Sequence, residues 1–521
     1  MNTRLISSFA ALTILLAGSM VVAGESTIAS MLTSPAGEAQ YAWTYKPLLT
    51  IGDNIGGYIP PGVPDGMGVL QSEDPDMVDI YINHELHEKR GYPYQLANGT
   101  QLTGARISRL SVNRSTREPV SAGLAYSKII DRQGQPVTSA HQLNESGNDK
   151  AGLSRLCSAR MIEAGTLGFS DHIYLTGEEA GRKDSHGRGG SAWALNTATH
   201  TLWAIPDIGR GAWENMTPVQ HTHSNKIALL LGDDTPGAPL YLYTGHKQAD
   251  GNFLERNGLA DGQLHCWRAD NRTATPAGFH GTGQSLNGHF VPVIVRDPDQ
   301  AGKLGYDNQG YLNGDRLRKQ AIQSGCFSFS RPEDLHNDPA NPTRAVFSST
   351  GRIGLYPDDY WGTLYTVDID VGKLTARLRI LYDSDDRNHR DEGIRSPDNL
   401  TWAANNRIYV QEDNAIGFGF FGTNGKEASI WEVDTNTGDA RRIAMIDRSV
   451  ILPKDGHDKY TGKTGAWESS GIIDVSNLFA KKPGQTVLLA NVQAHGIRDG
   501  LIGGKKDLVQ SGQLIFLTHT P

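Results

Sequence analysis

The sequence has little of what builds long helices, membrane spans or a disulfide framework. Its 521 residues include three cysteines, Cys157, Cys266 and Cys326, so at most one internal disulfide can form and one thiol is left over. After the first 23 residues no apolar run is long enough for a membrane-spanning helix. Sixty glycines and 24 prolines also argue against long helices. The composition favours an all-β fold.

The chain also lacks a basic cluster and the common hydrolase motifs. The net charge of −8 becomes −9 if a leader containing Arg4 is removed. Nucleic acid is therefore not an expected partner, whereas divalent or trivalent cations are. No G-x-S-x-G elbow, phosphate-cradling P-loop or H-E-x-x-H is present, so neither a serine hydrolase nor a zinc protease is supported.

The first residues are typical of an export signal. Arg4 precedes an apolar run (10–22), and small residues lead to a cleavage site predicted after Ala23. An uncleaved anchor is the alternative. We therefore expect a signal peptide over residues 1–23 and one domain over residues 24–521, exported to the periplasm or the medium. We expect no membrane span after cleavage, and a monomer.

The remaining chain contains a recurring hairpin. Six short runs rich in β-branched and aromatic residues predict strands at 78–82, 172–176, 226–231, 344–349, 407–411 and 486–491. A polar cluster precedes each run by roughly 9 to 18 residues, and another follows most of them directly. The spacing leaves room for two antiparallel strands and a turn. Helical periodicity is clear only in a short segment, 314–323.

Several of these units are followed by a second hairpin, as in 362–383 and 428–447. Two hairpins make four strands, which is the size of a propeller blade, so we predict a β-propeller with six blades. A pair of β-sandwiches or two smaller propellers are the alternatives. The irregular stretches 86–105, 130–155, 246–290 and 296–325 are predicted to be excursions or lids over the mouth of the propeller.

Both open ends of a hairpin lie on the same side, so the polar clusters should converge on one mouth. The residues expected there are Asp65, Glu85, Cys157, Glu178, Glu179, Glu214, Asp233, Asp234, Arg331, Glu333, Asp334, Asp398, Asn399, Glu412 and Asp413. So many carboxylates in one cavity repel one another unless cations neutralise them. Carboxylate oxygens suit Ca²⁺ or another hard cation, whereas a thiolate indicates a transition metal as well.

One of these clusters combines a cation with two adjacent acids. In the segment 327–336, Arg331 precedes Glu333 and Asp334 with Pro332 between them. Proline has a fixed φ and no N–H, so the neighbouring residues are held extended and their side chains are aimed. This arrangement suits a site that binds both a metal cation and an oxyanion.

The ordered set of clusters resembles a known family. The motifs PDGM, NHE, C…EE, WEN, GDD, RPEDL, PDNL and NVQ-x-x-G, in this order over about residues 40–500, are similar to those of the PhoX-type alkaline phosphatases of exported bacterial proteins. The resemblance implies a β-propeller whose mouth carries two iron ions and three calcium ions bridged by oxide. It also implies removal of phosphate from monoesters.

The resemblance assigns roles to individual residues. It implies that Cys157 and Glu214 hold iron together with Glu178 or Glu179. It further implies that calcium and iron share the ligands Glu85, Asp234, Glu333, Asp334 and Asp398, and that Arg331 binds the substrate phosphate.

The chain departs from the family pattern at four places. Gly177 stands where the family usually has the cysteine of C-E-E, and Trp213-Glu214-Asn215 replaces a His-Glu pair. The last cluster reads QAHG where QHPG is common, and a twin-arginine export signal is missing. These differences indicate a divergent branch.

The sequence therefore predicts a metal-dependent phosphatase that acts on a small phosphorylated substrate through a metal-bound oxide or hydroxide. Arg331 and Glu214 are the predicted catalytic residues, with Arg331 also binding substrate. The alternatives are a calcium propeller that hydrolyses lactones or phosphodiesters, and a non-catalytic exported propeller in which calcium only stabilises the mouth.

Overall fold

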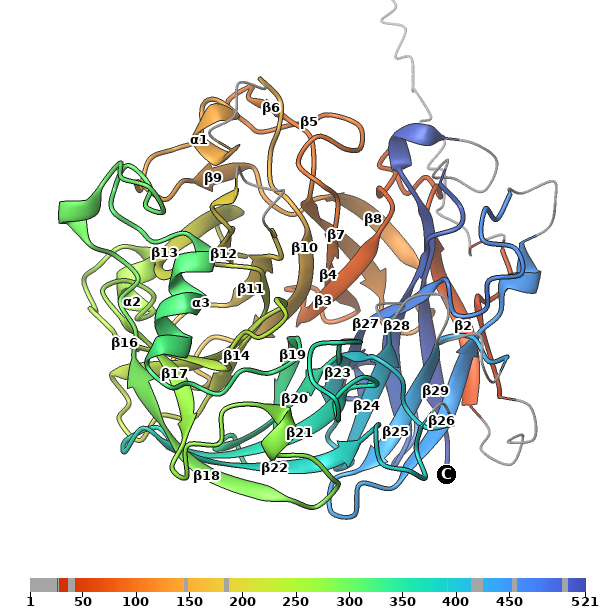
Figure 1. The fold of residues 1–521 in the computed structure, drawn as a ribbon. Coiled ribbons are helices and arrows are strands. Elements are labelled where there is room, and N and C mark those ends of the chain that lie inside the picture. Colours follow the sequence, from red (N-terminus) through yellow and green to blue (C-terminus); the bar gives the residue numbers. More distant parts are fainter. Residues whose placement is uncertain are drawn as a thin grey trace, which may run out of the picture.

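The structure, a computed structural model, describes residues 26, 28–35, 43–144, 149–181, 187–390, 392–413, 425–451, 457–498 and 505–521. Antiparallel sheets surround a central axis in these residues, which is the predicted β-propeller (Figure 1). The predicted signal peptide, residues 1–23, lies outside the described residues. Within the described ranges, no helix has the length and hydrophobicity needed to cross a membrane.

The chain builds the propeller one blade at a time, each blade starting with its innermost strand. The first blade contains β3 (Pro64–Gln71), β4 (Met77–His84), β7 (Arg106–Asn113) and β8 (Pro119–Leu124). The second contains β10 (Leu156–Ile162), β11 (Ile173–Glu178), β12 (Gly190–Asn196) and β13 (Thr201–Gly211), with β9 (Lys128–Ile130) parallel to β13. The third contains β14 (Trp213–Val219), β15 (Lys226–Asp233), β16 (Tyr241–His246), β17 (Gln263–Ala269) and β18 (Ser285–Pro292).

Three further blades complete the described chain. The fourth contains β19 (Pro332–Asn337), β20 (Arg344–Ser349), β21 (Thr363–Asp370) and β22 (Thr375–Asp383). The fifth contains β23 (Pro397–Trp402), β24 (Arg407–Glu412), β25 (Ser429–Asp434), β26 (Ala440–Ile446) and β1 (Leu32–Thr33). The sixth contains β27 (Glu468–Asp474), β28 (Thr486–Ala494), β29 (Ser511–His519) and β2 (Trp43–Thr50). Pairing of β18 with β22 joins the third and fourth blades into one nine-stranded sheet.

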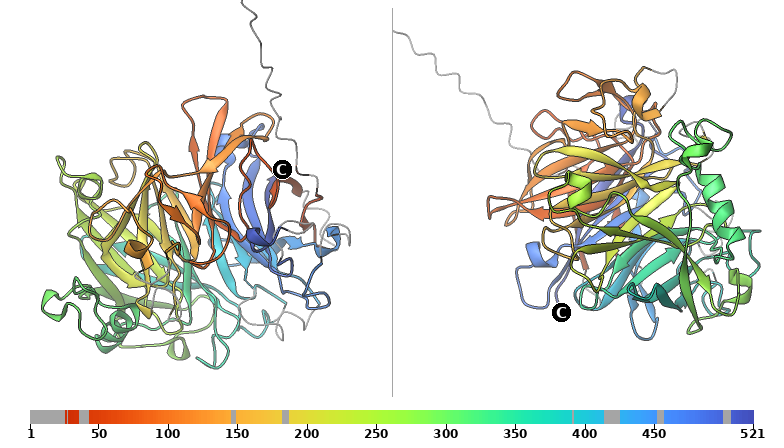
Figure 2. Two further views of the ribbon diagram at one scale, coloured as in Figure 1. Left: turned by 90° about the horizontal axis from the view of Figure 1, so that it is seen from above. Right: turned by 90° about the vertical axis from the view of Figure 1, so that its left-hand side faces the viewer.

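The blades form a closed ring. Each innermost strand contacts the next around the axis, in the order β3, β10, β14, β19, β23, β27 and back to β3. The sixth blade is completed by the N-terminal strand β2, which pairs with the C-terminal strand β29. The further views in Figure 2 show the same sheets from the side. The described chain forms one ring, so it is neither a pair of β-sandwiches nor two smaller propellers.

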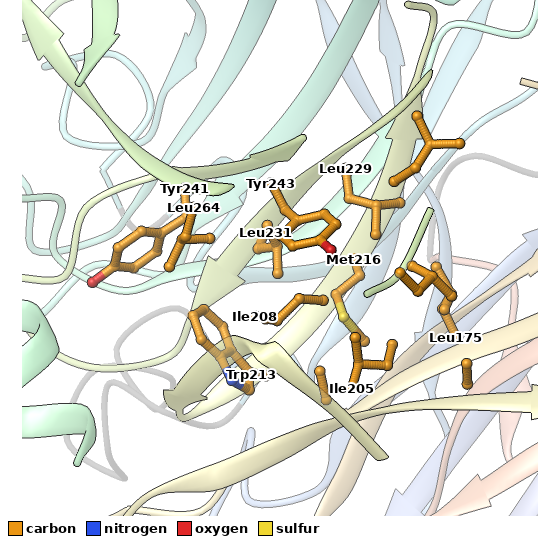
Figure 3. Close-up of a cluster of buried hydrophobic side chains, with 14 of the residues drawn as sticks. Leu175, Ile205, Ile208, Trp213, Met216, Leu229, Leu231, Tyr241, Tyr243 and Leu264 are labelled. Atoms are coloured by element: carbon orange, nitrogen blue, oxygen red, sulfur yellow. The ribbon is translucent and has the colours of Figure 1, made fainter. Parts of the chain in front are cut away.

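Apolar side chains hold neighbouring blades together. Six clusters of buried apolar residues occur in the described chain, each between two consecutive blades. Figure 3 shows the cluster between the second and third blades, which includes Leu175, Ile205, Ile208, Trp213, Met216, Leu229, Leu231, Tyr241, Tyr243 and Leu264. Burying one such side chain contributes about 1.5–3 kcal/mol. The ring is therefore a rigid support for side chains that point to its axis.

Helices are few and short. The segment predicted to be helical is α3 (Gly314–Gln323), so that prediction is confirmed. The other helices and minor strands are α1 (His141–Asn144), α2 (Phe253–Arg256), α5 (Ser476–Phe479), η2 (Pro276–Gly278), η3 (Pro298–Gln300), η4 (Arg448–Val450), η5 (Lys506–Leu508), β5 (Tyr94–Gln95) and β6 (Gln101–Leu102).

The stretch 246–290 is not the predicted lid. It contains β17 and most of β18, which extend the third blade outward by edge pairing with β16 and with β22. The sequence analysis missed these strands because polar residues and glycines interrupt their apolar pattern.

A disulfide ties this outer strand to the insertion that carries α3. Cys266 on β17 bonds Cys326, with 5.9 Å between the Cα atoms, while Cys157 is buried and free. The sequence had left open which cysteines pair. The remaining thiol is thus the one that lies at the axis.

We expect the variant Cys266→Ser/Cys326→Ser to unfold at a lower temperature than the wild type. The bridge closes a loop of 60 residues, and the chain-entropy model assigns such a loop about 4 kcal/mol. Calorimetry measures the change. Thiol titration of the unfolded wild type should find one reactive thiol without reductant and three with it; three thiols without reductant would contradict the pairing.

Candidate metal centre

Each innermost strand is bulged near its start. In every blade, the register between the innermost strand and the next strand shifts within a short segment. These segments are bounded by Pro64/Met67, Leu156/Ala159, Trp213/Met216, Pro332/Leu335, Pro397/Leu400 and Ser470/Ile472. A bulge places extra residues on one strand and re-aims their side chains. Each of the first five bulges encloses two residues, and at least one of the two belongs to the predicted mouth: Asp65, Cys157, Glu214, Glu333 with Asp334, and Asp398 with Asn399. One backbone feature, repeated around the ring, therefore turns these side chains toward the axis.

Ligand-type side chains from all six blades meet at this end of the axis. They form four overlapping groups of three, and in each group the possible ligand atoms lie within 4.8 Å of one another. We call the nine residues the acid cluster: Asp65, Glu85, Cys157, Glu179, Glu214, Glu333, Asp398, Asp413 and Glu468. All are buried except Glu85, which is partly exposed. The cluster contains eight carboxyl groups and one thiol.

The structure distinguishes the two adjacent glutamates after β11. Glu178 accepts hydrogen bonds from the backbone N–H groups of Ser154 (2.9 Å) and Ser191 (3.0 Å), so it holds the blade together. Glu179 points to the acid cluster. Successive side chains of an extended chain face opposite ways, which is why only one glutamate of the pair reaches the axis.

The same division of roles occurs in two other blades. At the end of β15, Asp233 points away from the cluster and pairs with Arg318, with 3.0 Å between the charged atoms. The next residue, Asp234, lies beside the cluster. At the end of β24, Glu412 pairs with a fully buried arginine, whereas Asp413 belongs to the cluster. The second acid of each pair is the one at the mouth.

A buried guanidinium lies on one side of the cluster. Arg331 makes two contacts with Asp234, at 2.6 Å from Nε and 2.9 Å from Nη2. It also lies 2.9 Å from Glu333 and 3.6 Å from Asp413. Burial alone would raise the pKa of Asp234, but Arg331 overrides this and holds that pKa well below its usual range.

A second arginine lies on the other side. Arg155 contacts Glu85 at 2.7 Å and also pairs with Glu179. Sequence reasoning missed this residue, although Arg155 stands two positions before Cys157 as Arg331 stands two before Glu333. The two arginines thus occupy matching places in the second and fourth blades.

The arginines do not balance the charge of the cluster. The pKa of Glu214 is raised well above its usual value, mainly by burial and secondly by the negative charge of Asp65. Burial and the charge of Asp413 do the same to Asp398, and burial with Asp65 raises the pKa of the Cys157 thiol. These groups are therefore strained as anions unless additional positive charge is present.

The donor atoms of the cluster fit bound metal ions. Glu214 Oε2 and Asp398 Oδ1 are buried and have no hydrogen-bond partner in the described structure. A buried carboxylate oxygen without a partner is costly. Both residues belong to the same ligand-type group with Glu333. Carboxylate oxygens suit hard cations, and the Cys157 thiol adds a donor that suits a transition metal.

Two of the predicted ligands lie outside the cluster. Glu178 is one, as described above. Asp334 is the other: it accepts hydrogen bonds from the Ser158 hydroxyl (2.8 Å), the Asn215 amide and the Leu400 N–H (2.8 Å). Burial raises the pKa of Asp334 to about 6. This carboxyl links four blades from within and has no oxygen facing the cluster groups.

The remaining predicted residues are brought together. The structure gathers Glu85, Cys157, Glu179, Glu214, Glu333 and Asp398 in the cluster, with Asp234 and Arg331 beside it. Glu468 was missed, although its Trp467-Glu468 pair repeats Trp213-Glu214 and was an available signal. Its strand bulges later, at Ser470, so the analogy was harder to see. His495 contacts Glu468 at 3.0 Å.

The cluster opens into a cleft of about 510 Å³. Acids and arginines of the centre line part of the cleft, and residues from the surrounding loops line the remainder. The lining residues outside the centre include Arg352, Tyr460, His495 and Arg498. A small molecule can therefore reach the cluster from this side.

Comparison with known proteins gives a family for the middle of the chain. Residues 196–449 match the family model described as alkaline phosphatase PhoX. This range contains Glu214, Glu333, Asp398 and Asp413 of the acid cluster. No sequence among the curated proteins matches the chain.

The fold has a clear counterpart among solved structures. Pseudomonas fluorescens PhoX, in complex with the transition-state analogue vanadate, is 16% identical with a TM-score of 0.62, covering 96% of this chain and 97% of that chain. A Comamonas testosteroni quinohemoprotein alcohol dehydrogenase (10% identical, TM-score 0.34, coverage 90% and 61%) and a Coprinopsis cinerea GH62 α-L-arabinofuranosidase (10%, 0.31, 78% and 98%) are too distant to carry an argument. The resemblance is thus confirmed: residues 196–449 match the PhoX alkaline phosphatase model, and the described chain has the fold of the solved Pseudomonas fluorescens PhoX structure.

Proposed function

We propose that this protein is a metal-dependent phosphatase that hydrolyses phosphate monoesters at the acid cluster. The observation that carries the proposal is the convergence of eight carboxyl groups and one thiol from six blades, between two partly buried arginines. The family match over residues 196–449 supports it. A small phosphorylated molecule is the proposed substrate.

Calcium and ferric iron are the proposed cofactors. The group of Cys157, Glu179 and Glu214 contains sulfur and is proposed to hold iron, while the groups that share Asp398 offer only oxygen and suit calcium. When bound, these ions would polarise a phosphoryl oxygen and lower the pKa of the attacking water. Glu214 belongs to both kinds of group, so its removal should disturb both.

Arg331 is proposed to bind the phosphoryl oxygens of the substrate. Its guanidinium lines the cleft and is fixed by Asp234 and Glu333 before any substrate arrives. A donor that is already oriented stabilises developing negative charge without reorganisation. The planar fork of arginine matches two phosphoryl oxygens at once. Arg155 is proposed to fix the orientation of Glu85 and Glu179, with which it forms ion pairs.

The surroundings of the site fit an exported protein. A disulfide between Cys266 and Cys326 suits an oxidising compartment. The leader pattern of residues 1–23 supports the same location. We propose a monomer that is released into the periplasm or the medium.

The free thiol disfavours the calcium-only alternatives. A calcium propeller that cleaves lactones or phosphodiesters, or one that only binds a partner, would have no use for sulfur at the axis. Cys157 belongs to two of the four ligand-type groups. Its place is explained by a centre that includes a transition metal.

Glu179→Gln and Glu178→Gln form a matched pair of variants. We expect Glu179→Gln to lose bound metal and at least roughly 100-fold of the turnover of an aryl phosphate, because a cluster ligand is removed. Glu178→Gln should keep both, because Glu178 only accepts backbone hydrogen bonds. Elemental analysis and steady-state kinetics measure the effects. Equal loss in the two variants would contradict this placement of the ligands.

Arg331→Gln should lower kcat and raise KM for phosphate esters, with kcat/KM falling roughly 100-fold or more, because one contact serves substrate and transition state. The matched control is Arg318→Gln, whose side chain pairs with Asp233 outside the cleft. Kinetics of the control should stay close to wild type. Unchanged kinetics of Arg331→Gln would remove this residue from the site.

Removing metal with a chelator should lower the melting temperature. An ion whose free concentration is about 100-fold above its Kd increases the free energy of unfolding by about 3 kcal/mol. That contribution is lost when a chelator removes the ion. Carboxyl groups whose pKa is raised by folding make the metal-free protein less stable as pH increases. The loss should therefore be larger at mildly alkaline than at acidic pH. Calorimetry with and without added calcium checks both points; a melting temperature that the chelator leaves unchanged would contradict bound ions.

A further inference from the structure

A second cavity lies at the other end of the propeller axis. Its volume is about 370 Å³, and it is lined by the far ends of the innermost strands rather than by their bulged starts. We call it the far cavity. Five innermost strands contribute the residue that directly follows the bulge: Gly68, Arg160, His336, Thr401 and Ile473.

Arg160 is the cation of the far cavity, and both of its hydrogen-bond partners are neutral. His336 Nδ1 lies 2.8 Å from the carbonyl oxygen of Asn337. A carbonyl only accepts, so Nδ1 carries the hydrogen and Nε2 accepts from Arg160 Nη1. Arg160 Nη2 donates to the Asn337 side-chain oxygen at 2.9 Å.

No carboxylate forms an ion pair with Arg160 in the described part of the chain. Asp334 acts on it only through space, because the Asp334 oxygens accept hydrogen bonds from Ser158, Asn215 and Leu400. Asp474 lines the cavity, but it accepts the N–H groups of Ala404 and Ser476 at 2.9 Å. Glu163 also lines the cavity and is exposed.

Arg160 therefore has both charge and donors to offer. Each Nη of a guanidinium carries two N–H groups, and Arg160 uses one on each. The side chain is only partly buried, so the cavity reaches it. A charged side chain that is removed from bulk water normally forms an ion pair. In the described part of the chain, no carboxylate forms one with Arg160.

The walls of the far cavity combine apolar and polar side chains. Apart from Arg160, His336 and the two acids, the lining includes Met67, Val69, Met161, Pro339, Trp402 and Ile473. A concave space in which apolar walls meet a small number of polar groups is typical of a small-molecule site. An inorganic ion would leave these walls unused.

We propose that the far cavity binds a small organic anion. The anionic group of the ligand lies on the free N–H groups of Arg160, and its apolar body packs against Met161 and Ile473. This site is separate from the acid cluster, and it does not depend on the proposed phosphatase activity.

Benzoate and its neutral isostere benzamide are suitable probes, used with the metal-loaded full chain in calorimetric titrations. We expect benzoate to bind with a Kd on the order of 1 mM, as its size allows, and benzamide to bind roughly tenfold more weakly. Arg160→Gln should weaken benzoate binding to the level of benzamide. The matched control Arg109→Gln removes an arginine of β7 that pairs with Asp79, and should bind as wild type.

Two further variants keep the test decisive if Arg160→Gln folds poorly. Ile473→Trp fills the far cavity and leaves Arg160 in place, so it should abolish benzoate binding. Arg331→Gln alters the cleft of the acid cluster and should keep it. Equal binding of benzoate and benzamide, binding that survives both Arg160→Gln and Ile473→Trp, or a solvent-filled cavity without saturable binding would each overturn the proposal.

Discussion

Repulsion among buried carboxyl groups at the propeller axis is the interaction on which the rest of the structure depends. Eight such groups and a thiol share a space in which neighbouring ligand atoms lie within 4.8 Å. In water these side chains would move apart, but the blades hold them in place. Arg155 and Arg331 neutralise only their nearest acids. Bound cations would complete the balance and provide the chemistry.

Holding this charge requires a rigid frame, and the frame has two components. Apolar clusters lie between consecutive blades all round the ring, and pairing of β2 with β29 closes the last blade. The repeated bulges then aim the polar residues inward. At the far end of the same strands the alternation resumes, and Arg160 faces the axis there with neutral partners. One scaffold thus presents two chemically different ends.

Much of the fold was predictable, because hairpins are local. Turn residues and strand runs lie close in sequence, so the paired strands and α3 were found correctly. The strands β17 and β18 were not, because polar residues interrupt their apolar pattern. Within the site, Glu178 and Glu179 could not be told apart, since a shift of one residue reverses which side chain faces the axis. Glu468 was missed because the bulge of its strand lies two residues further along, so its position does not match those of the other bulge residues.

By itself, the sequence determined that the protein is a ring of β-hairpins with acid-bearing ends and a spare thiol. Strand pattern, turn residues and the order of the polar clusters are local properties, and they carry that information. Only the tertiary structure decided which acids meet at the axis, which serve as backbone acceptors and which arginines accompany them. Glu333 and Asp334 show the reason, because these adjacent residues lie in one bulge and yet take opposite roles, according to which neighbouring blade each side chain meets.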